Sequence, residues 1–167
     1  MTGDAGLPGA DLAAEIIAAL TGRGQTVAVA ESLTGGLVGA ALTTVPGSSA
    51  AFAGGIVAYA TGLKARLLGV AEGLLAEHGP VCPEVAAAMA AGVSARLEAT
   101  YGLATTGVAG PGPAEGRAAG TVFVAVSGPG LAEVRGLQIA GGREDVRAAS
   151  VQAVLALLAG ALREDIS

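Results

Sequence analysis

A single serine stands between an apolar run and a glycine-rich turn in the stretch VAVAESLTGGLVGAAL, residues 27–42. Ser32 therefore lies where a strand is expected to pass into a helix, beside amides that could stabilise an anion or an oxyanion. Serine is also a common helix N-cap, so the pattern allows a cap or a nucleophile. A nucleophilic serine needs a base, because its hydroxyl is weakly nucleophilic at neutral pH. The one histidine, His78, precedes a Gly-Pro turn and is typical of a solvated loop residue, so a Ser-His-Asp triad is poorly supported.

The chain's only lysine is the remaining candidate base, together with a nearby tyrosine. Lys64 lies in YATGLK, five residues after Tyr59, and both follow a second apolar run. Tyr59 would lie at the carboxyl end of that strand and Lys64 about one helical turn later, so both could face the cleft beside Ser32. Desolvation or nearby positive charge lowers the pKa of a lysine toward that of a useful base, and a tyrosine hydroxyl can relay a proton. The alternative is a surface lysine beside a tyrosine packed at a strand end.

Two further segments could bind an anion. TTGVAGPGP, residues 105–113, follows a third apolar run, and its glycines expose backbone donors suited to a phosphate or an amide, although a tight loop would also explain it. It is neither a P-loop nor a GxGxxG fingerprint. Arg143 and Arg147 begin the last expected helix in GGREDVR, where cations oppose the helix dipole. An anionic ligand would account for them, and so would a pair with Glu144, Asp145 or another carboxylate.

These residues need a scaffold that brings strand ends together. Apolar positions at helical spacing predict helices from Asp11 to Gly22, Leu33 to Thr44, Pro83 to Gly102 and Glu144 to Leu162, with two short helical pieces between. Apolar runs predict strands at residues 26–30, 54–59 and 103–106, followed by an antiparallel hairpin in TVFVAVSG and LAEVRGLQIA. Short apolar strands that alternate with helices indicate an α/β fold. We expect a three-layer α/β/α sandwich, whose sheet is mixed because of the hairpin.

Composition limits the class of protein. The length of 167 residues predicts one domain, residues 9–167, after an N-terminal segment, residues 1–8, that we expect to be disordered. A net charge of −5, no run of Lys or Arg, and 2% aromatic residues argue against a nucleic-acid partner. One His and one Cys without metal-ligand spacing predict no metal site. The absence of a long apolar stretch or a secretory signal pattern predicts a cytoplasmic protein without a membrane partner.

Six segments, taken in order, are more specific than any one of them. They are VAVAESLTGGLVGAAL, GSSAAFAGGIVAYATGLKARLLGV, HGPVCPEVAAAMA, TTGVAGPGP, GTVFVAV and GGREDVR. Together they resemble the C-terminal domain family of the competence/damage-inducible protein CinA, over about residues 9–163. Characterised stand-alone members of this family are nicotinamide-nucleotide amidases. The larger family protein carries a further N-terminal, molybdopterin-binding-like domain, for which we expect no room in a chain of this length.

The resemblance implies hydrolysis of the carboxamide of nicotinamide mononucleotide to nicotinate mononucleotide and ammonia, in pyridine nucleotide recycling and without a metal or cofactor. It implies Ser32 as the nucleophile, Lys64 as its base, and Tyr59 as the group through which the proton reaches the departing ammonia. The amides of residues 33–36 would hold the oxyanion, and helix N-terminal amides, the Gly-rich loop and an arginine would bind the 5′-phosphate. The implied substrate-binding residues are Thr34, Gly35, Gly36, Thr106, Gly107, Gly110, Arg143 and Arg147.

Some positions depart from the family's usual pattern. YATGLK stands where members commonly have Y-S-N-E-x-K, which removes a polar group and a carboxylate near Lys64. Cys82 stands where a serine usually begins the next helix, and Pro113 replaces a loop glycine, which removes one donor. These changes affect the predicted substrate fit and activity. Two other hypotheses therefore stand: a catalytically weak nucleotide- or protein-binding module of the same fold, and a structural oligomer built on Ala-rich helices. Whichever hypothesis holds, we expect a homo-oligomer, with a dimer favoured.

Overall fold

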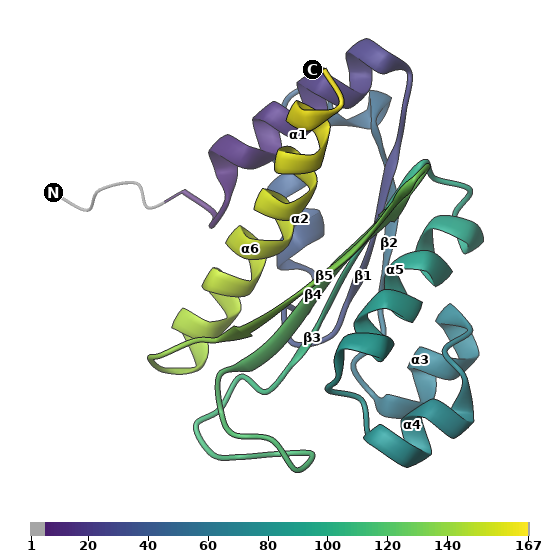
Figure 1. Ribbon diagram of the computed structural model, residues 1–167. Coiled ribbons are helices and arrows are strands. Elements are labelled where there is room, and N and C mark those ends of the chain that lie inside the picture. Colours follow the sequence, from purple (N-terminus) through teal and green to yellow (C-terminus); the bar gives the residue numbers. More distant parts are fainter. Residues whose placement is uncertain (1–5, 167) are drawn as a thin grey trace, which may run out of the picture.

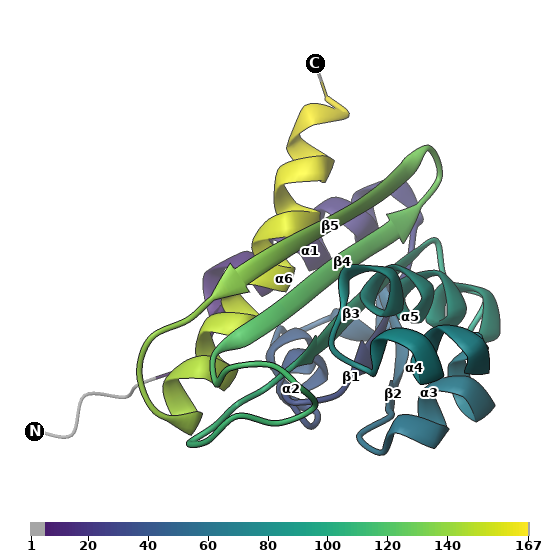
Figure 2. The same cartoon turned by 60° about the horizontal axis from the view of Figure 1, so that its bottom comes forward.

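A computed structural model describes residues 6–166, and one sheet of five strands lies at its centre. The strands are β1 (Val27–Glu31), β2 (Phe52–Val57), β3 (Tyr101–Gly107), β4 (Thr121–Gly128) and β5 (Leu131–Gln138). They lie in the order β2-β1-β3-β4-β5, as Figures 1 and 2 show. β1 is parallel to β2 and β3, whereas β4 is antiparallel to β3 and β5. The predicted mixed sheet with an antiparallel hairpin is thereby confirmed.

Helices cover both faces of this sheet. α1 (Ala10–Arg23), α2 (Leu37–Thr43) and α6 (Arg143–Glu164) lie on one face, and α3 (Thr61–Leu68), α4 (Glu72–His78) and α5 (Pro83–Arg96) lie on the other (Figure 1). A short 3-10 helix, Ser48–Ala50, precedes β2. The result is the expected three-layer α/β/α sandwich. Residues 1–5 of the segment predicted to be disordered lie outside the described residues, and residues 6–8 lead into α1.

Alternate residues of β1 contribute to the two cores. Val27 and Val29 pack in the cluster formed with α1, α2 and α6, while Ala28 and Ala30 pack in the cluster formed with α5. The small residues on the second face let α5 lie close to the sheet, because a Cβ on Gly102 would overlap the carbonyl of Ala90. Close helix approach explains how a core with few aromatic residues is filled.

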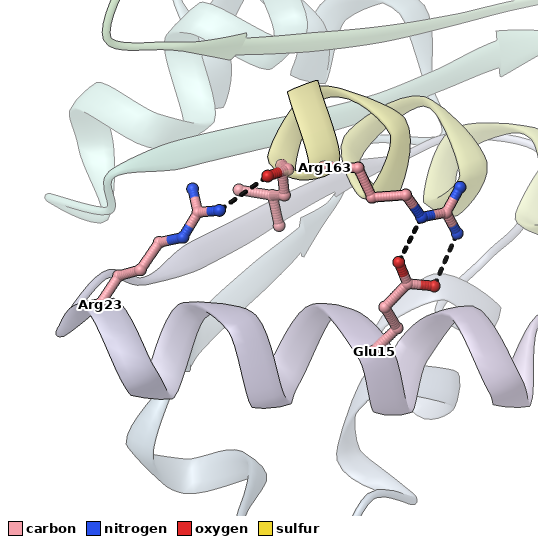
Figure 3. A network of polar contacts seen from close by, with 4 residues as sticks. Glu15, Arg23 and Arg163 are labelled. Atoms are coloured by element: carbon pink, nitrogen blue, oxygen red, sulfur yellow. Dashed lines mark hydrogen bonds and ion pairs between the residues drawn. The ribbon is translucent and has the colours of Figure 1, made fainter. Parts of the chain in front are cut away.

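α6 is a core helix that also contacts α1. By length and hydropathy it is the one described helix that could cross a membrane, but half of its apolar stretch is buried inside the protein. Figure 3 shows two polar contacts between the helices: Arg163 forms a forked ion pair with Glu15, and Arg23 Nη2 donates to the carbonyl of Leu162 at 2.7 Å. The predicted buried face is confirmed at Val151, Val154, Leu155, Leu158 and Leu162.

The predicted start of α1 and the predicted end of α5 are wrong. α1 begins at Ala10 behind a left-handed Gly9, so Asp11 lies in the first turn and is not the cap. α5 ends at Arg96 rather than near Gly102. Glu98 adopts a left-handed φ of 52°, which ends the helix and leads into β3.

The topology creates a crevice at the carboxyl end of β1. The chain leaves β1 through α2 on one face and leaves β2 through α3, α4 and α5 on the other, so the two connections diverge beside β1. Ligands bind outside such switch points in α/β sheets. The carboxyl ends of β2, β3 and β5 lie at the same edge, which is the lower edge of the sheet in Figure 1. This edge brings together the segments that follow each of these strands.

Candidate active site

Ser32 and Lys64 lie in contact inside the protein. Ser32 follows β1, and Lys64 extends from α3, so that its Nζ is 2.9 Å from the Ser32 Oγ. Only 7% of Ser32 and 1% of Lys64 is exposed to solvent. The Ser32 amide donates to the carbonyl of Thr105 on β3 at 3.2 Å, which fixes the serine between two parallel strands. The structure thus brings together the candidate nucleophile and the candidate base.

The surroundings of Lys64 suit a neutral amine. Burial lowers the pKa of Lys64 to about 8, although the negative charge of Glu115 opposes the shift. The Nζ also lies 2.7 Å from the Ala58 carbonyl oxygen and 3.3 Å from that of Tyr59. A neutral amine has two N–H donors and one lone pair. When the two carbonyls accept the N–H groups, the lone pair is left to accept the Ser32 hydroxyl proton, which is the arrangement that a general base requires.

Glu31, which sequence reasoning did not select, caps α2. Its carboxylate is 2% exposed; Oε1 accepts from the amides of Gly36 and Val38 at 3.2 and 2.9 Å, and Oε2 accepts from Gly39 at 3.0 Å. The alternative of Ser32 as the N-cap is therefore wrong. An acidic residue inside an apolar run just before a glycine-rich turn is the signal that could have identified this buried cap.

The turn between β1 and α2 offers fewer donors than expected. The predicted helix start at Leu33 is wrong: α2 begins at Leu37, because Gly35 and Gly36 take left-handed φ values of 56° and 115°. The Gly35 amide donates to the Ser32 carbonyl at 3.1 Å, and that of Gly36 donates to Glu31, so neither is free for an oxyanion. Among residues 6–166, the amides of Leu33 and Thr34 form no hydrogen bond.

Thr34 and Arg147 form contacts that stabilise this turn. The Thr34 hydroxyl is buried and lies 2.9 Å from that of Thr105. Arg147 Nε donates to the carbonyl of Leu33 at 3.0 Å, and its Nη2 lies 3.5 Å from that of Thr34. The lining of the pocket beside Ser32 does not include the predicted substrate-binding residues Thr34, Gly35, Gly36 and Arg147.

A pocket opens at the edge of the sheet beside Ser32 and Lys64. Five segments contribute its walls: the turn after β1, the start of α3, the loop before α5, the β3–β4 loop and the start of α6. The lining residues are Ser32, Leu33, Tyr59, Thr61, Lys64, Pro80, Val81, Thr106, Gly107, Val108, Ala109, Gly110, Gly112, Ala114, Glu115 and Arg143. Thr106 donates its hydroxyl proton to the Pro80 carbonyl at 2.6 Å, so its oxygen can only accept from a ligand. His78 is absent from this lining.

Tyr59 and Arg143 form the outer rim of the pocket. Tyr59 is 61% exposed, and its hydroxyl accepts from Arg143 Nη2 at 3.3 Å. Arg143 Nη1 donates to the carbonyl of Gly110 at 2.8 Å. The carbonyl of Tyr59, and not its hydroxyl, contacts Lys64, so the expected proton-relay contact is not formed.

The alternative of a carboxylate partner for the two arginines is also wrong. Neither Arg143 nor Arg147 forms an ion pair within residues 6–166. Asp145 accepts instead from the Gly142 amide at 2.8 Å and caps α6. No carboxylate of the described residues therefore compensates the positive charge of Arg143 at the pocket.

Comparison with known proteins agrees with the motifs and the fold. A relative from Frankia casuarinae described as a "CinA-like protein" is 53% identical over 143 residues, which are 86% of this chain and 33% of the relative. A crystal structure of the competence/damage inducible protein CihA from Agrobacterium tumefaciens is 37% identical with a TM-score of 0.87, covering 92% of this chain and 94% of that one. A competence-damaged protein (CinA) superfamily structure from Enterobacter cloacae is 31% identical with a TM-score of 0.89, covering 97% and 96%.

The fraction of the other protein that the match covers differs between the curated relatives and the solved structures. The chain spans about a third of the length of the curated relatives it matches, whereas it covers nearly the whole of the solved structures. The family model of the CinA C-terminal domain matches residues 9–162. The resemblance seen in the sequence is therefore confirmed, and the chain belongs to the CinA C-terminal domain family.

Proposed function

We propose that this protein hydrolyses the carboxamide of nicotinamide mononucleotide to nicotinate mononucleotide and ammonia through an acyl-enzyme on Ser32. The observation that carries the proposal is the 2.9 Å contact between Ser32 Oγ and a buried Lys64 Nζ in the lining of the pocket. A serine beside a desolvated lysine can act as a nucleophile without histidine or a metal.

The acylation step uses Lys64 as base and then as acid. Neutral Lys64 takes the Ser32 hydroxyl proton while Oγ attacks the carboxamide carbon. The Leu33 amide forms no hydrogen bond among the described residues, and Leu33 lines the pocket, so this amide is the donor that remains for the developing oxyanion. As the tetrahedral intermediate collapses, the C–N bond breaks, and the Lys64 ammonium transfers its proton to the nitrogen, which leaves as ammonia. Tyr59 is not needed as a relay in this step, since Nζ itself lies beside Oγ.

The deacylation step repeats the chemistry with water. Neutral Lys64 takes a proton from a water molecule that attacks the nicotinoyl ester, and the ester C–O bond then breaks. The Lys64 proton returns to Ser32 Oγ, and the carboxylic acid product releases its remaining proton to solvent and leaves as a carboxylate. Water supplies the hydroxyl group, so the enzyme is regenerated without a metal or cofactor.

The phosphate position follows from which positive groups remain available. The amides at the N-terminus of α2 donate to the Glu31 carboxylate, so that helix end is not open to an anion. Arg143 at the rim, beside the Gly-rich loop at Gly107 and Gly110, is the cation suited to a 5′-phosphate. The Thr106 oxygen would accept from the carboxamide N–H. The occupied amides of α2 are thereby removed from the predicted phosphate site, while Arg143 and the Gly-rich loop keep the role predicted for them.

A product assay tests the proposal. Purified protein is incubated with nicotinamide mononucleotide, and ammonia and nicotinate mononucleotide are measured for the wild type, Ser32→Ala and Lys64→Ala. Ser150→Ala serves as the matched control, because Ser150 is also buried but bonds within α6 at Val146. We expect product only from the wild type and the control.

Two outcomes would contradict the mechanism. Equal turnover in all four proteins would exclude Ser32 and Lys64 from the chemistry. Binding of the nucleotide by every protein without product from any would instead favour the binding-module hypothesis. A cytoplasmic location and a role in pyridine nucleotide recycling belong to the proposal, as does assembly into a homodimer.

A further inference from the structure

One acidic side chain lines the pocket, and its role is not explained by the chemistry above. We propose that Glu115 recognises the positive charge of a pyridinium ring, so that the site selects amides of cationic, N-substituted pyridines over uncharged ones. The inference rests on the proposed function, because it concerns the same pocket and the same reacting amide.

Glu115 provides an uncompensated negative charge at the site. It is the only carboxylate among the pocket-lining residues, and it forms no ion pair within the described part of the chain. Its charge reaches Lys64, because it opposes the lowering of the Lys64 pKa by burial. When Lys64 is in its neutral, reactive form, Glu115 faces a pocket in which Arg143 is the only other charged group. A ligand with a positive centre would complete this arrangement.

The backbone conformation of Glu115 is costly for a glutamate. Ala114 and Arg117 exchange two backbone hydrogen bonds of 3.0 and 2.9 Å, which close a two-residue turn. Its central residues, Glu115 and Gly116, have φ values of 52° and 71°, the pattern of a type I′ turn. Glycine, asparagine and aspartate suit such a position, whereas a glutamate there is strained. The turn therefore does not itself call for glutamate, and it holds this residue at the wall of the pocket.

The two unpaired charges match the two charges of the proposed substrate. Nicotinamide mononucleotide carries a cationic ring and an anionic phosphate, and the pocket presents Glu115 and Arg143 on different segments. A cationic ring would also be repelled by the ammonium that forms on Lys64 during acylation. The Glu115 carboxylate offsets that repulsion at the moment when the positive charge in the pocket is greatest.

The test measures binding, because the ring charge also changes the intrinsic reactivity of the amide. In a Ser32→Ala background, calorimetry compares nicotinamide mononucleotide with its reduced, uncharged dihydropyridine form. With Glu115 present, we expect the cationic form to bind about fivefold more tightly, the upper range for one partly exposed charge pair. Glu115→Gln should bring the ratio of the two dissociation constants close to one.

The chain offers a matched control for this substitution. Glu98 is the only other described non-glycine residue with a positive φ, and its value is also 52°, but it is exposed and lies outside the pocket. Glu98→Gln removes the same charge from the same backbone conformation. We expect it to leave the binding ratio unchanged. An equal loss of preference in Glu98→Gln and Glu115→Gln would reduce the effect to net charge and overturn the proposal.

A second ligand pair separates failure of this inference from failure of the proposed function. 1-Methylnicotinamide and nicotinamide differ in ring charge and lack the phosphate. If the nucleotide is not hydrolysed but 1-methylnicotinamide shows a Glu115-dependent advantage, the charge recognition stands and the substrate is wrong. If the nucleotide is hydrolysed and neither cationic ligand depends on Glu115, the function stands and the recognition is wrong. No binding of any of the four ligands overturns both.

Discussion

Lys64→Met tests the physical basis of the active base, because it removes a buried charge and keeps a side chain of similar length. Lys64 is the first by volume of the fully buried side chains among residues 6–166, and burial lowers its pKa from 10.5 to about 8. We expect the variant to be inactive. We also expect a characteristic change in stability with pH, which reports on desolvation independently of any substrate.

The sign and size of this change follow from linkage. Below pH 8 both folded and unfolded chains hold the Lys64 proton, so the wild type carries the full cost of a buried ammonium. Between pH 8 and 10.5 the folded chain has released the proton while the unfolded chain still binds it, so the wild type becomes more stable as the pH rises. At about 1.36 kcal/mol per pKa unit, the wild type should gain about 2.5 kcal/mol relative to Lys64→Met from about pH 7 to about pH 10.

A second effect of the substitution does not depend on this proton. The Ala58 carbonyl loses its Nζ donor, which costs the variant about 1–3 kcal/mol at every pH. The variant should therefore be about as stable as the wild type at neutral pH and clearly less stable in alkali. The change with pH, rather than the value at one pH, is the informative quantity.

Urea unfolding of both proteins between neutral pH and about pH 10 gives this difference directly. Arg66→Met is the control, since it removes an exposed cation from the same helix, α3. The control should differ from the wild type by a constant amount. If the difference between wild type and Lys64→Met is also constant, to within about 0.5 kcal/mol, then Lys64 is not desolvated and its role as a neutral base loses its support.

Two further predictions concern the supports of the nucleophile turn. Glu31→Gln replaces a two-oxygen acceptor with an amide whose NH2 group faces backbone donors. We therefore expect the free energy of unfolding, measured in urea, to fall by about 2–3 kcal/mol. Unchanged stability would mean that the carboxylate does not cap α2. Arg147→Lys removes the fork that holds the Leu33 and Thr34 carbonyls, so kcat should fall by about tenfold or more while KM for the nucleotide changes little. A rise in KM alone would place Arg147 in contact with the substrate.

The two candidate site residues that the sequence predicted to face one cleft are those whose positions are fixed by topology. Ser32 follows β1, and Lys64 follows the neighbouring parallel strand β2, so the carboxyl ends of two adjacent strands place them together. No fine geometry is needed for that inference. A parallel pair and a rare residue type, the only lysine, were sufficient.

Side-chain directions in the loops could not be predicted in the same way. Tyr59 lies beyond the end of β2, where strand alternation no longer sets the orientation, and its carbonyl rather than its hydroxyl faces Lys64. Arg143 and Arg147 lie one helical turn apart on α6. A small rotation of α6 about its axis therefore decides which arginine reaches the pocket and which one reaches the turn between β1 and α2. The cap on α2 was missed because local capping rules consider the residue at the helix start, whereas Glu31 reaches forward across a turn of glycines.

The cap on α2 also affects which physical effect lowers the pKa of Lys64. Because Glu31 neutralises the helix terminus nearest Ser32, the positive end of that dipole contributes little to the Lys64 pKa, and burial is the main cause of its lowering. At pH 7 a pKa of about 8 leaves roughly one Lys64 in ten neutral, compared with about one in three thousand at its ordinary value. Glu115 is the group that opposes this shift. On the proposed function, a bound pyridinium ring would cancel the charge of Glu115 and exclude water from Lys64 at once. Both effects lower the Lys64 pKa further, so the correct substrate would increase the fraction of active base that attacks it.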